Sequence, residues 1–355
     1  MKLRAAGPAS LPSRTITVRR RGLSIALPLR GALAVLLILF ALVPVFVAAL
    51  AVGEYPLSWG DVVRTLFGEG TPQSEFIVET LRLPRVLDAI LVGAALGVAG
   101  AVFQSVTRNP LGSPDVIGFT QGAAAGAVLE LVVFGGGTLA VSAGAVAGGV
   151  ITAALVYLLA YRNGLQGYRL VLVGIGFSAM LAAATAYLIA RADLDAAQGA
   201  QIWLVGSLNG RGWEHVVPVA AALALLLPAA LALAPALRTL ELGDRAAGPL
   251  GVAVERSRLF AIAAGVGLTA VATASVGPVA FVALASPQLA RRLTRTSGPG
   301  LLGAAAMGAF VLALSDFLAQ RLFPSTPLPV GVFTGALGGL YLLWLLSTEL
   351  RGAGQ

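Results

Sequence analysis

Long apolar segments follow one another along the whole chain, and they constrain its fold more than any other feature. A helix needs about 20 residues to cross a lipid core of roughly 30 Å. We therefore predict ten membrane helices, and the fold class is an all-α polytopic membrane protein. The predicted segments are 31–52, 86–107, 116–134, 139–161, 170–190, 216–237, 259–276, 278–290, 301–318 and 328–347.

The domain organisation follows from these segments. A ten-helix membrane domain is predicted over residues 31–350, after a basic N-terminal tail, 1–30, and before a short C-terminal tail, 351–355. The eighth segment is too short to span a bilayer alone. It follows Gly277 and starts at Pro278, which has no N–H to donate, so we predict a helix that is broken inside the membrane.

Missing residue types exclude several kinds of chemistry. The sequence has no cysteine and a single histidine, His215, so thiol nucleophiles, thiolate metal sites and histidine-built metal sites are excluded. Its one lysine is Lys2. A Walker loop needs a lysine after its glycines to reach the β- and γ-phosphates of ATP. We therefore predict that this chain is not an enzyme and binds no cofactor or metal, and that any ATP is hydrolysed by a partner.

The net charge of +8 could indicate nucleic-acid binding, but the arginines gather at the ends of apolar segments rather than on a soluble face. Ten spans place both termini on one side, and most basic residues lie in the loops and tails of that side. The positive-inside rule assigns it to the cytoplasm. We predict a multi-pass protein of the bacterial cytoplasmic (inner) membrane with cytoplasmic termini. A cleavable signal ending at 49–51 is the alternative, disfavoured because nine more apolar runs follow.

Glycines are frequent inside the predicted helices. Small residues let membrane helices approach closely where lipid supplies no hydrophobic drive. Close packing is predicted at Gly93, Gly97, Gly100, Gly122, Gly126, Gly335, Gly338 and Gly339. Outside the segments, the stretch 53–81 has an amphipathic pattern around Trp59, which predicts a short helix at the membrane surface.

Carboxylates inside the predicted helices are few: Asp88, Glu130 and Asp316. Ionisable groups there cost on the order of a few kcal/mol and are functional candidates by default. We predict that Asp88 and Asp316 pair with Arg85 and Arg321, whereas Glu130 has no obvious partner. An ion- or proton-coupled secondary transporter would need a denser relay of carboxylates, so it is the less favoured class.

Several long motifs resemble one known family. They are RLPR at 82–85, LVGAALGVAGAVFQ at 91–104, RNPLGSPDVIGF at 108–119, LELGDRAAGPLGV at 240–252, GPVAFVALASPQLARR at 277–292 and LPVGVFTGALGGLYLLWLL at 328–346. The chain is similar to the FecCD-type permeases, the membrane subunits of bacterial ATP-driven importers for iron siderophores, haem and vitamin B12. The resemblance implies the type II ABC importer permease fold, as in the vitamin B12 importer.

Finer motifs, such as GSLNG at 206–210 and GVAVERSRL at 251–259, resemble the second permease of ferric enterobactin importers. This implies translocation of a ferric siderophore of catecholate type, with haem or cobalamin import as the alternative. The implied partners are a second homologous permease subunit in a heterodimer, two ATPase subunits that bind ATP and Mg²⁺, an extracytoplasmic siderophore-binding protein and membrane lipid, with no nucleic acid.

The resemblance also implies site residues at both faces of the membrane. Outer-face arginines would dock the binding protein: Arg82, Arg85 and Arg321. Snorkelling to lipid headgroups is the alternative for them. Coupling helices at about 238–255 would seat in a groove of the ATPase, with Leu240 and Leu250 as apolar anchors, although a solvated loop is the alternative. The other coupling candidates are Gly243, Asp244, Ala247, Gly251 and Val252.

Small and polar residues would line the translocation path, because a bulky substrate is handed on rather than held. The resemblance implies these candidates: Thr120, Gln121, Ser178, Thr185, Gln201 and Thr334. For each of them a hydrogen bond between helices is the alternative.

Overall fold

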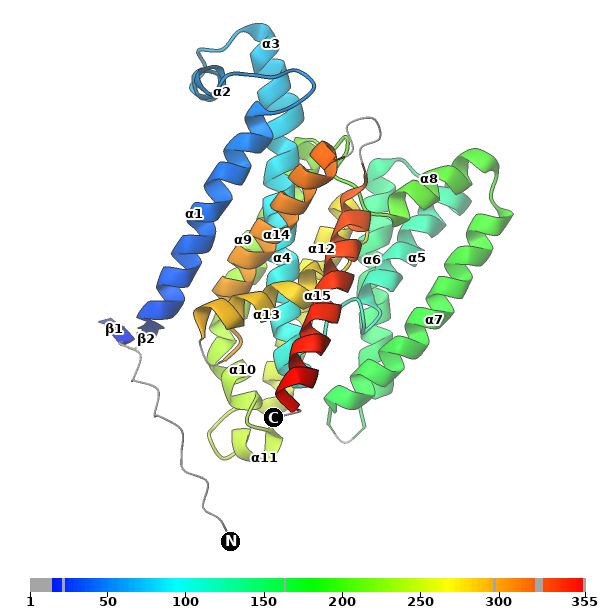
Figure 1. Cartoon of the computed structure of the whole chain (residues 1–355). Helices are drawn as coiled ribbons and strands as arrows, with labels where there is room; N and C mark the ends of the chain where they lie inside the picture. Colours follow the sequence, from blue (N-terminus) through cyan, green and yellow to red (C-terminus); the bar gives the residue numbers. More distant parts are fainter. Residues whose placement is uncertain (1–14, 21–22, 163, 296–297, 323–327, 354–355) are drawn as a thin grey trace.

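The computed structural model describes residues 15–20, 23–162, 164–295, 298–322 and 328–353. Figure 1 shows a bundle of long helices that run from one end of the molecule to the other, with one shorter helix, α13, lying across them. The helices, in chain order, are α1 Leu29–Ala51, α2 Trp59–Leu66, α3 Pro72–Glu75, η1 Phe76–Arg82, α4 Leu83–Thr107, α5 Phe119–Leu129, η2 Glu130–Phe134, α6 Thr138–Ala160, α7 Gly167–Arg191, α8 Leu194–Leu204, α9 Trp213–Ala232, α10 Ala234–Leu240, α11 Asp244–Ala247, α12 Val254–Val276, α13 Val282–Thr294, α14 Leu301–Leu322 and α15 Val330–Ala353.

Seven helices in the described part of the chain are long and apolar enough to cross a membrane. They are α1, the continuous helix 72–107 that ends in α4, α6, α7, α9, α12 and α14. Two shorter apolar helices cover Phe119–Phe134 and Val330–Trp344. The helical membrane fold is therefore confirmed, and the total of ten spans stays a prediction.

The break predicted at 277–278 lies between α12 and α13. Gly277 has a φ of 78°, a backbone conformation that favours glycine, and Pro278 cannot donate the hydrogen bond that would continue α12. α13 then begins at Val282 and has 13 residues, too few to span a bilayer. The predicted start at Pro278 is corrected by four residues, because the chain from Pro278 to Phe281 is not helical.

The central helix of the bundle is α4, which packs against α9, α12, α13 and α14. Its side chains are buried around the whole circumference, as expected for a helix that is apolar on all sides. The large hydrophobic core is built around α4 residues such as Val92, Val98 and Phe103. By contrast, α1 and α7 have mostly exposed apolar side chains, which suits helices at the lipid-facing periphery.

Glycines make the closest helix contacts of the bundle. A Cβ on Gly93 of α4 would lie 2.7 Å from the carbonyl carbon of Gly308 on α14, and one on Gly97 would lie 2.9 Å from that of Ala304. Close packing is also confirmed at Gly100, Gly122, Gly126 and Gly338. The prediction is wrong at Gly335 and Gly339, where a Cβ would meet nothing within 4 Å.

Regular secondary structure extends into both predicted tails. Residues Thr15–Arg20 and Leu23–Pro28 form antiparallel strands β1 and β2, with Thr15 paired to Pro28 and Arg20 to Leu23. All four residues 15–18 are β-branched, which favours a strand. At the other terminus α15 continues to Ala353, inside the predicted tail 351–355. Lys2 lies outside the described residues.

The two ends of the bundle carry different features. The surface helix predicted near Trp59 is α2, whose N-terminal Ser58 side chain accepts from the Asp61 N–H at 3.2 Å. Figure 1 shows α2 and α3 at one end. The strands β1 and β2, the helices α10 and α11, and the end of α15 lie at the opposite end. The two groups of residues implied as docking sites are therefore on opposite ends of the molecule.

Candidate functional site

The first candidate surface is formed by α10 and α11, and we call residues 237–258 the α10–α11 surface. Two short helices were predicted here, and both are present. Gly243 separates them with a φ of 102°, where a side chain would be strained. Gly251 and Val252 continue the surface towards α12.

Arg258 fixes this surface to the bundle. Its guanidinium is buried, with 2% of the side chain exposed, and donates to Asp244 at 2.7 Å, to Glu255 at 3.1 Å and to the carbonyl of Leu165 at 2.6 Å. Planar guanidinium groups suit several such acceptors at once. Asp244, a predicted coupling residue, therefore holds α11 on α12 and on the loop that precedes α7.

Burial divides the apolar residues of this surface into two groups. Leu240 is 2% exposed and Ala247 is fully buried, so both belong to the core of this chain. Because Leu240 is buried in its own chain, it is not an anchor for a partner, and that prediction is corrected. Leu250 is 65% exposed, and Leu242, which sequence reasoning missed, is 69% exposed. Leu237 and Leu240 are three residues apart and share one helix face, whereas Leu242 does not lie on that face. This spacing is the sequence signal that distinguishes Leu242 from the two buried leucines.

The second candidate site lies at the opposite end, around the end of α1. Arg82 donates to the carbonyls of Leu50 at 2.7 Å and Tyr55 at 2.6 Å, and Arg321 donates to the carbonyl of Val52. The final carbonyls of a helix have no partner within the helix and carry partial negative charge. Two of the three predicted docking arginines thus satisfy the end of α1.

The third arginine, Arg85, forms an ion pair between α4 and α14. Its Nε donates to Asp316 at 2.9 Å and its Nη2 at 2.7 Å, a two-bond geometry with only 4% of the Asp316 side chain exposed. Gln320 also donates to Asp316, at 2.8 Å. The predicted pairing of Asp316 with Arg321 is therefore wrong, and Arg85 takes that place.

Asp88 joins a separate polar cluster between α4, α9 and α12. It accepts from Ser275 at 2.7 Å and is fully buried, so its predicted pairing with Arg85 is wrong. The nearby Arg211 lies 2.9 Å from Nε2 of His215. Burial lowers the pKa of Arg211, while Asp88 and Glu214 act in the opposite direction. Glu130 begins η2 and lies against Gly144 of α6.

The six predicted path residues lie on four helices, α5, α7, α8 and α15. Ser178 donates to the Gly174 carbonyl at 2.9 Å and Thr334 to the Gly331 carbonyl at 3.2 Å, both within their own helices. Gln121 and Gln201 are exposed on α5 and α8, and Thr185 is buried on α7.

Thr120 is the path candidate with the most informative contact. Its hydroxyl donates to Asp115 at 2.6 Å. Burial raises the pKa of Asp115, whereas hydrogen bonds from Thr120 and from the backbone N–H of Phe281 lower it. The hydrogen bond from Thr120 therefore holds Asp115 at the start of α5.

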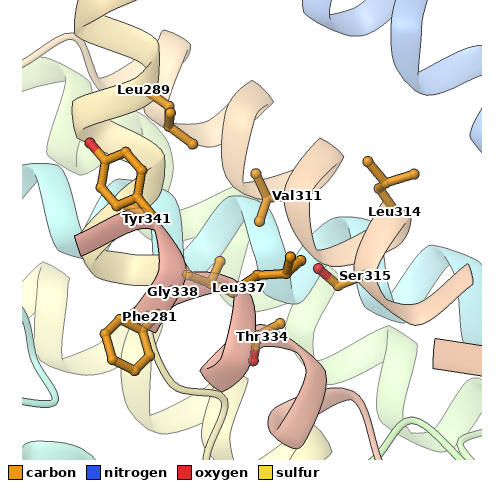
Figure 2. Close-up of a pocket in the computed structure, with 11 residues that line it drawn as sticks. Phe281, Leu289, Val311, Leu314, Ser315, Thr334, Leu337, Gly338 and Tyr341 are labelled. Atoms are coloured by element: carbon orange, nitrogen blue, oxygen red, sulfur yellow. The ribbon is translucent and has the colours of Figure 1, made fainter. Parts of the chain in front are cut away.

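A small apolar pocket of about 170 Å³ lies between α13, α14 and α15 (Figure 2). Its walls include Phe281, Leu289, Val311, Leu337 and Tyr341. Thr334 is the path candidate among its lining residues.

The fold defines the class of protein. It is similar to the inward-facing structure of a metal-chelate type ABC transporter, with a TM-score of 0.79 and 28% sequence identity, over 89% of this chain and 99% of that chain. The chain is thus a membrane permease subunit of an ABC transporter and not an enzyme, because its counterparts are membrane subunits that work with a separate ATPase.

The sequence comparisons then define the family. Residues 36–348 match the model of the FecCD transport family, so the chain belongs to that family. It is 46% identical to the ferric enterobactin transport system permease protein FepG of Escherichia coli (strain K12), over 89% of this chain and 96% of that protein. It is 39% identical to the achromobactin transport system permease protein CbrC of Dickeya dadantii (strain 3937), over 89% and 90%. The family predicted from the motifs is confirmed.

Proposed function

We propose that this chain is the permease subunit of an ATP-driven importer that carries a ferric siderophore of catecholate type across the inner membrane into the cytoplasm. The observation that carries the proposal is the 46% identity to FepG over nearly the full length of both proteins. The achromobactin permease CbrC stands at 39%. We therefore take the substrate class from FepG, the more similar of these two relatives, whose name specifies ferric enterobactin.

The proposed assembly contains a second homologous permease, two ATPase subunits that bind ATP and Mg²⁺, and an extracytoplasmic siderophore-binding protein. The absence of a Walker lysine requires that another subunit hydrolyse ATP. The exposed Leu242 and Leu250 support ATPase docking at the α10–α11 surface, because exposed apolar side chains amid charges are typical of interface anchors. The α10–α11 surface then faces the cytoplasm, together with both termini.

Docking of the binding protein is proposed at the opposite end, around Arg82 and Arg321. Both guanidiniums bind backbone carbonyls rather than carboxylates. A carboxylate from a binding protein would form stronger, charge-assisted hydrogen bonds than these neutral acceptors do. Arg85 is the weaker docking candidate, because Asp316 already provides it with two charged acceptors.

Charge reversal separates these roles. We expect Arg82→Glu and Arg321→Glu to reduce affinity for the binding protein strongly, measured by binding of that protein to the purified transporter. Arg64→Glu, on the exposed face of α2, is the matched charge control. Unchanged affinity in both variants would remove the docking role.

The substrate is tested by uptake of radiolabelled iron complexed to enterobactin, to a hydroxamate siderophore or to haem, with labelled cobalamin as a further arm. Cells that lack this gene are compared with the same cells complemented. Selective loss with the enterobactin complex supports the proposal. Loss with haem or cobalamin instead would keep the family and overturn the catecholate assignment.

The heterodimer is tested by expressing this chain with the ATPase and the binding protein, with and without the second permease. We expect uptake when both permeases are present and none with this chain alone. Transport by a complex that contains two copies of this chain would overturn the heterodimer.

A further inference from the structure

The apolar pocket between α13, α14 and α15 is open at the surface of the bundle. Leu337, one of its lining residues, is exposed, as are Leu340 and Leu343 further along α15. In a chain that spans the membrane, an exposed apolar surface at this depth is covered by lipid unless another subunit covers it. Engineered apolar cavities of about 150 Å³ hold a benzene-sized ligand. At about 170 Å³ the pocket is therefore large enough for the end of a hydrocarbon chain.

On α13 the lining of the pocket continues as a stripe along one helix face. Val282, Ala285 and Leu289 line the pocket. Arg292 follows three residues after Leu289. Side chains three and four residues apart lie on the same face of a helix, so Arg292 extends this stripe by one turn beyond the pocket.

α15 carries a second stripe that faces the first. Thr334, Leu337 and Tyr341 line the pocket, and Trp344 follows on the same face. The rings of Tyr341 and Trp344 lie 6.0 Å apart between their centres. Figure 2 shows the pocket part of both stripes, with Leu289 and Tyr341 towards one end and Thr334 towards the other. We call the two stripes and the pocket between them the α13–α15 groove.

The two stripes meet at Arg292 and Trp344, where the guanidinium carbon lies 4.8 Å from the centre of the indole ring. From Thr334 to Trp344, α15 runs towards the end of the bundle that carries α10 and α11 (Figure 1). Ten residues of helix rise about 15 Å, which is half of a hydrocarbon core of roughly 30 Å. Tryptophan is typical of the boundary between core and headgroups. The α13–α15 groove thus has the length of one leaflet and ends at headgroup level.

Arg292 provides a positive charge at that level. Its side chain is exposed, and no carboxylate among the described residues forms an ion pair with it. Arg295, which follows the last residue of α13, is exposed as well. By contrast, Arg291 donates to Gln104 of α4 and is directed into the bundle. Basic pockets between membrane helices on the cytoplasmic side bind anionic lipid headgroups.

We propose that the α13–α15 groove is a binding site for an anionic phospholipid, with one acyl chain in the apolar pocket and the phosphate at Arg292. The pocket alone suits the chain of any lipid, and Arg292 is the feature that favours a negative headgroup. The inference goes beyond the proposed import function, and it rests on that function only for the assignment of the groove to the cytoplasmic leaflet.

The test uses the fluorescence of Trp344 in the full chain, reconstituted in lipid nanodiscs. Replacing Trp59, Trp203 and Trp213 with phenylalanine leaves Trp344 as the only tryptophan. Phospholipids brominated on the acyl chain quench a tryptophan that they contact. We expect brominated phosphatidylglycerol to reach half-maximal quenching at about fivefold lower mole fraction than brominated phosphatidylcholine, the preference expected for one arginine near an anionic headgroup.

Four variants separate the headgroup contact from general contact with lipid. Arg292→Gln should remove the preference for phosphatidylglycerol, whereas Arg292→Lys keeps the charge and should retain it. Arg64→Gln, on α2 at the opposite end of the bundle, is the matched charge control and should leave the preference unchanged. Val311→Phe fills the pocket from α14 and should raise the mole fraction of brominated phosphatidylglycerol that is needed. Each variant is compared with its own unquenched signal, because Arg292 itself contacts the indole ring.

Equal quenching by the two lipids in the chain with the intact groove would overturn the proposal, and so would a preference that survives Arg292→Gln. A photoreactive phosphatidylglycerol in the complete transporter gives an independent result. Crosslinks to peptides that contain residues 282–292 or 334–344 support the site. Crosslinks that form in the chain alone and disappear in the complete transporter would show that another subunit covers the groove, which would also overturn the proposal.

These measurements involve no imported compound. Failure of the lipid site therefore leaves the proposed function standing, and a different substrate in the uptake experiment leaves the lipid site standing.

Discussion

Replacing Gly93 with alanine should separate α4 and α14, which approach each other closely at this glycine. The new Cβ would lie 2.7 Å from the carbonyl carbon of Gly308, and the carbonyl oxygen is closer still. Ordinary contact begins at 3.4 Å. Because the obstacle is backbone rather than a mobile side chain, α4 and α14 must move apart by roughly 1 Å, as expected for overpacking of a well-packed core.

The energetic cost follows from two opposing effects. Overpacking of this kind costs about 1–3 kcal/mol. Alanine is a better helix former than glycine by about 1 kcal/mol, which offsets part of the loss. Gly176→Ala on α7 is the matched control, because it changes the same atoms inside a helix where a Cβ would meet nothing within 4 Å.

The measurement is the free energy of unfolding of the purified chain in detergent, by titration with a denaturing detergent. Subtracting the control removes the helix-propensity term. We expect Gly93→Ala to be less stable than Gly176→Ala by about 1–3 kcal/mol. If the two variants are equally stable, the close approach of α4 to α14 does not limit packing and the reasoning is refuted.

Three further outcomes are expected. Arg85→Ala should destabilise the chain by about 3 kcal/mol, because it leaves the buried Asp316 carboxylate with Gln320, a neutral partner. The double change Arg85→Met with Asp316→Leu should cost less in the same unfolding assay, because it removes both charges. A larger loss in the double variant would contradict this. Leu242→Ser and Leu250→Ser should each weaken co-purification of the ATPase without lowering the melting temperature, since both side chains are exposed. A lower melting temperature at unchanged co-purification would place them in the core instead. Arg258→Met should lower stability by about 2 kcal/mol, because three acceptors lose a buried donor, and an unchanged melting temperature would exclude that anchoring role.

Some features of the site were accessible from local sequence and others were not. Gly243 and Gly277 are visible as breaks because glycine and proline limit the backbone wherever they occur. Leu240 and Leu242 are two residues apart and chemically identical, yet one is buried and the other exposed. Their spacing shows that they do not share a helix face, but which of the two is buried depends on how α10 packs against its neighbours, and local sequence does not give that packing.

The sequence by itself determined that the chain spans a membrane and that one of its helices is broken. It also determined that a partner hydrolyses ATP and which family the motifs resemble. These conclusions depend on the length of apolar runs, on Pro278 and on the absence of a Walker lysine, which are properties of composition and order along the chain. The tertiary structure alone decided that Asp316 pairs with Arg85 and that Asp88 accepts from Ser275. Such pairs join residues far apart in sequence, and they form only where packing brings two particular helix faces together.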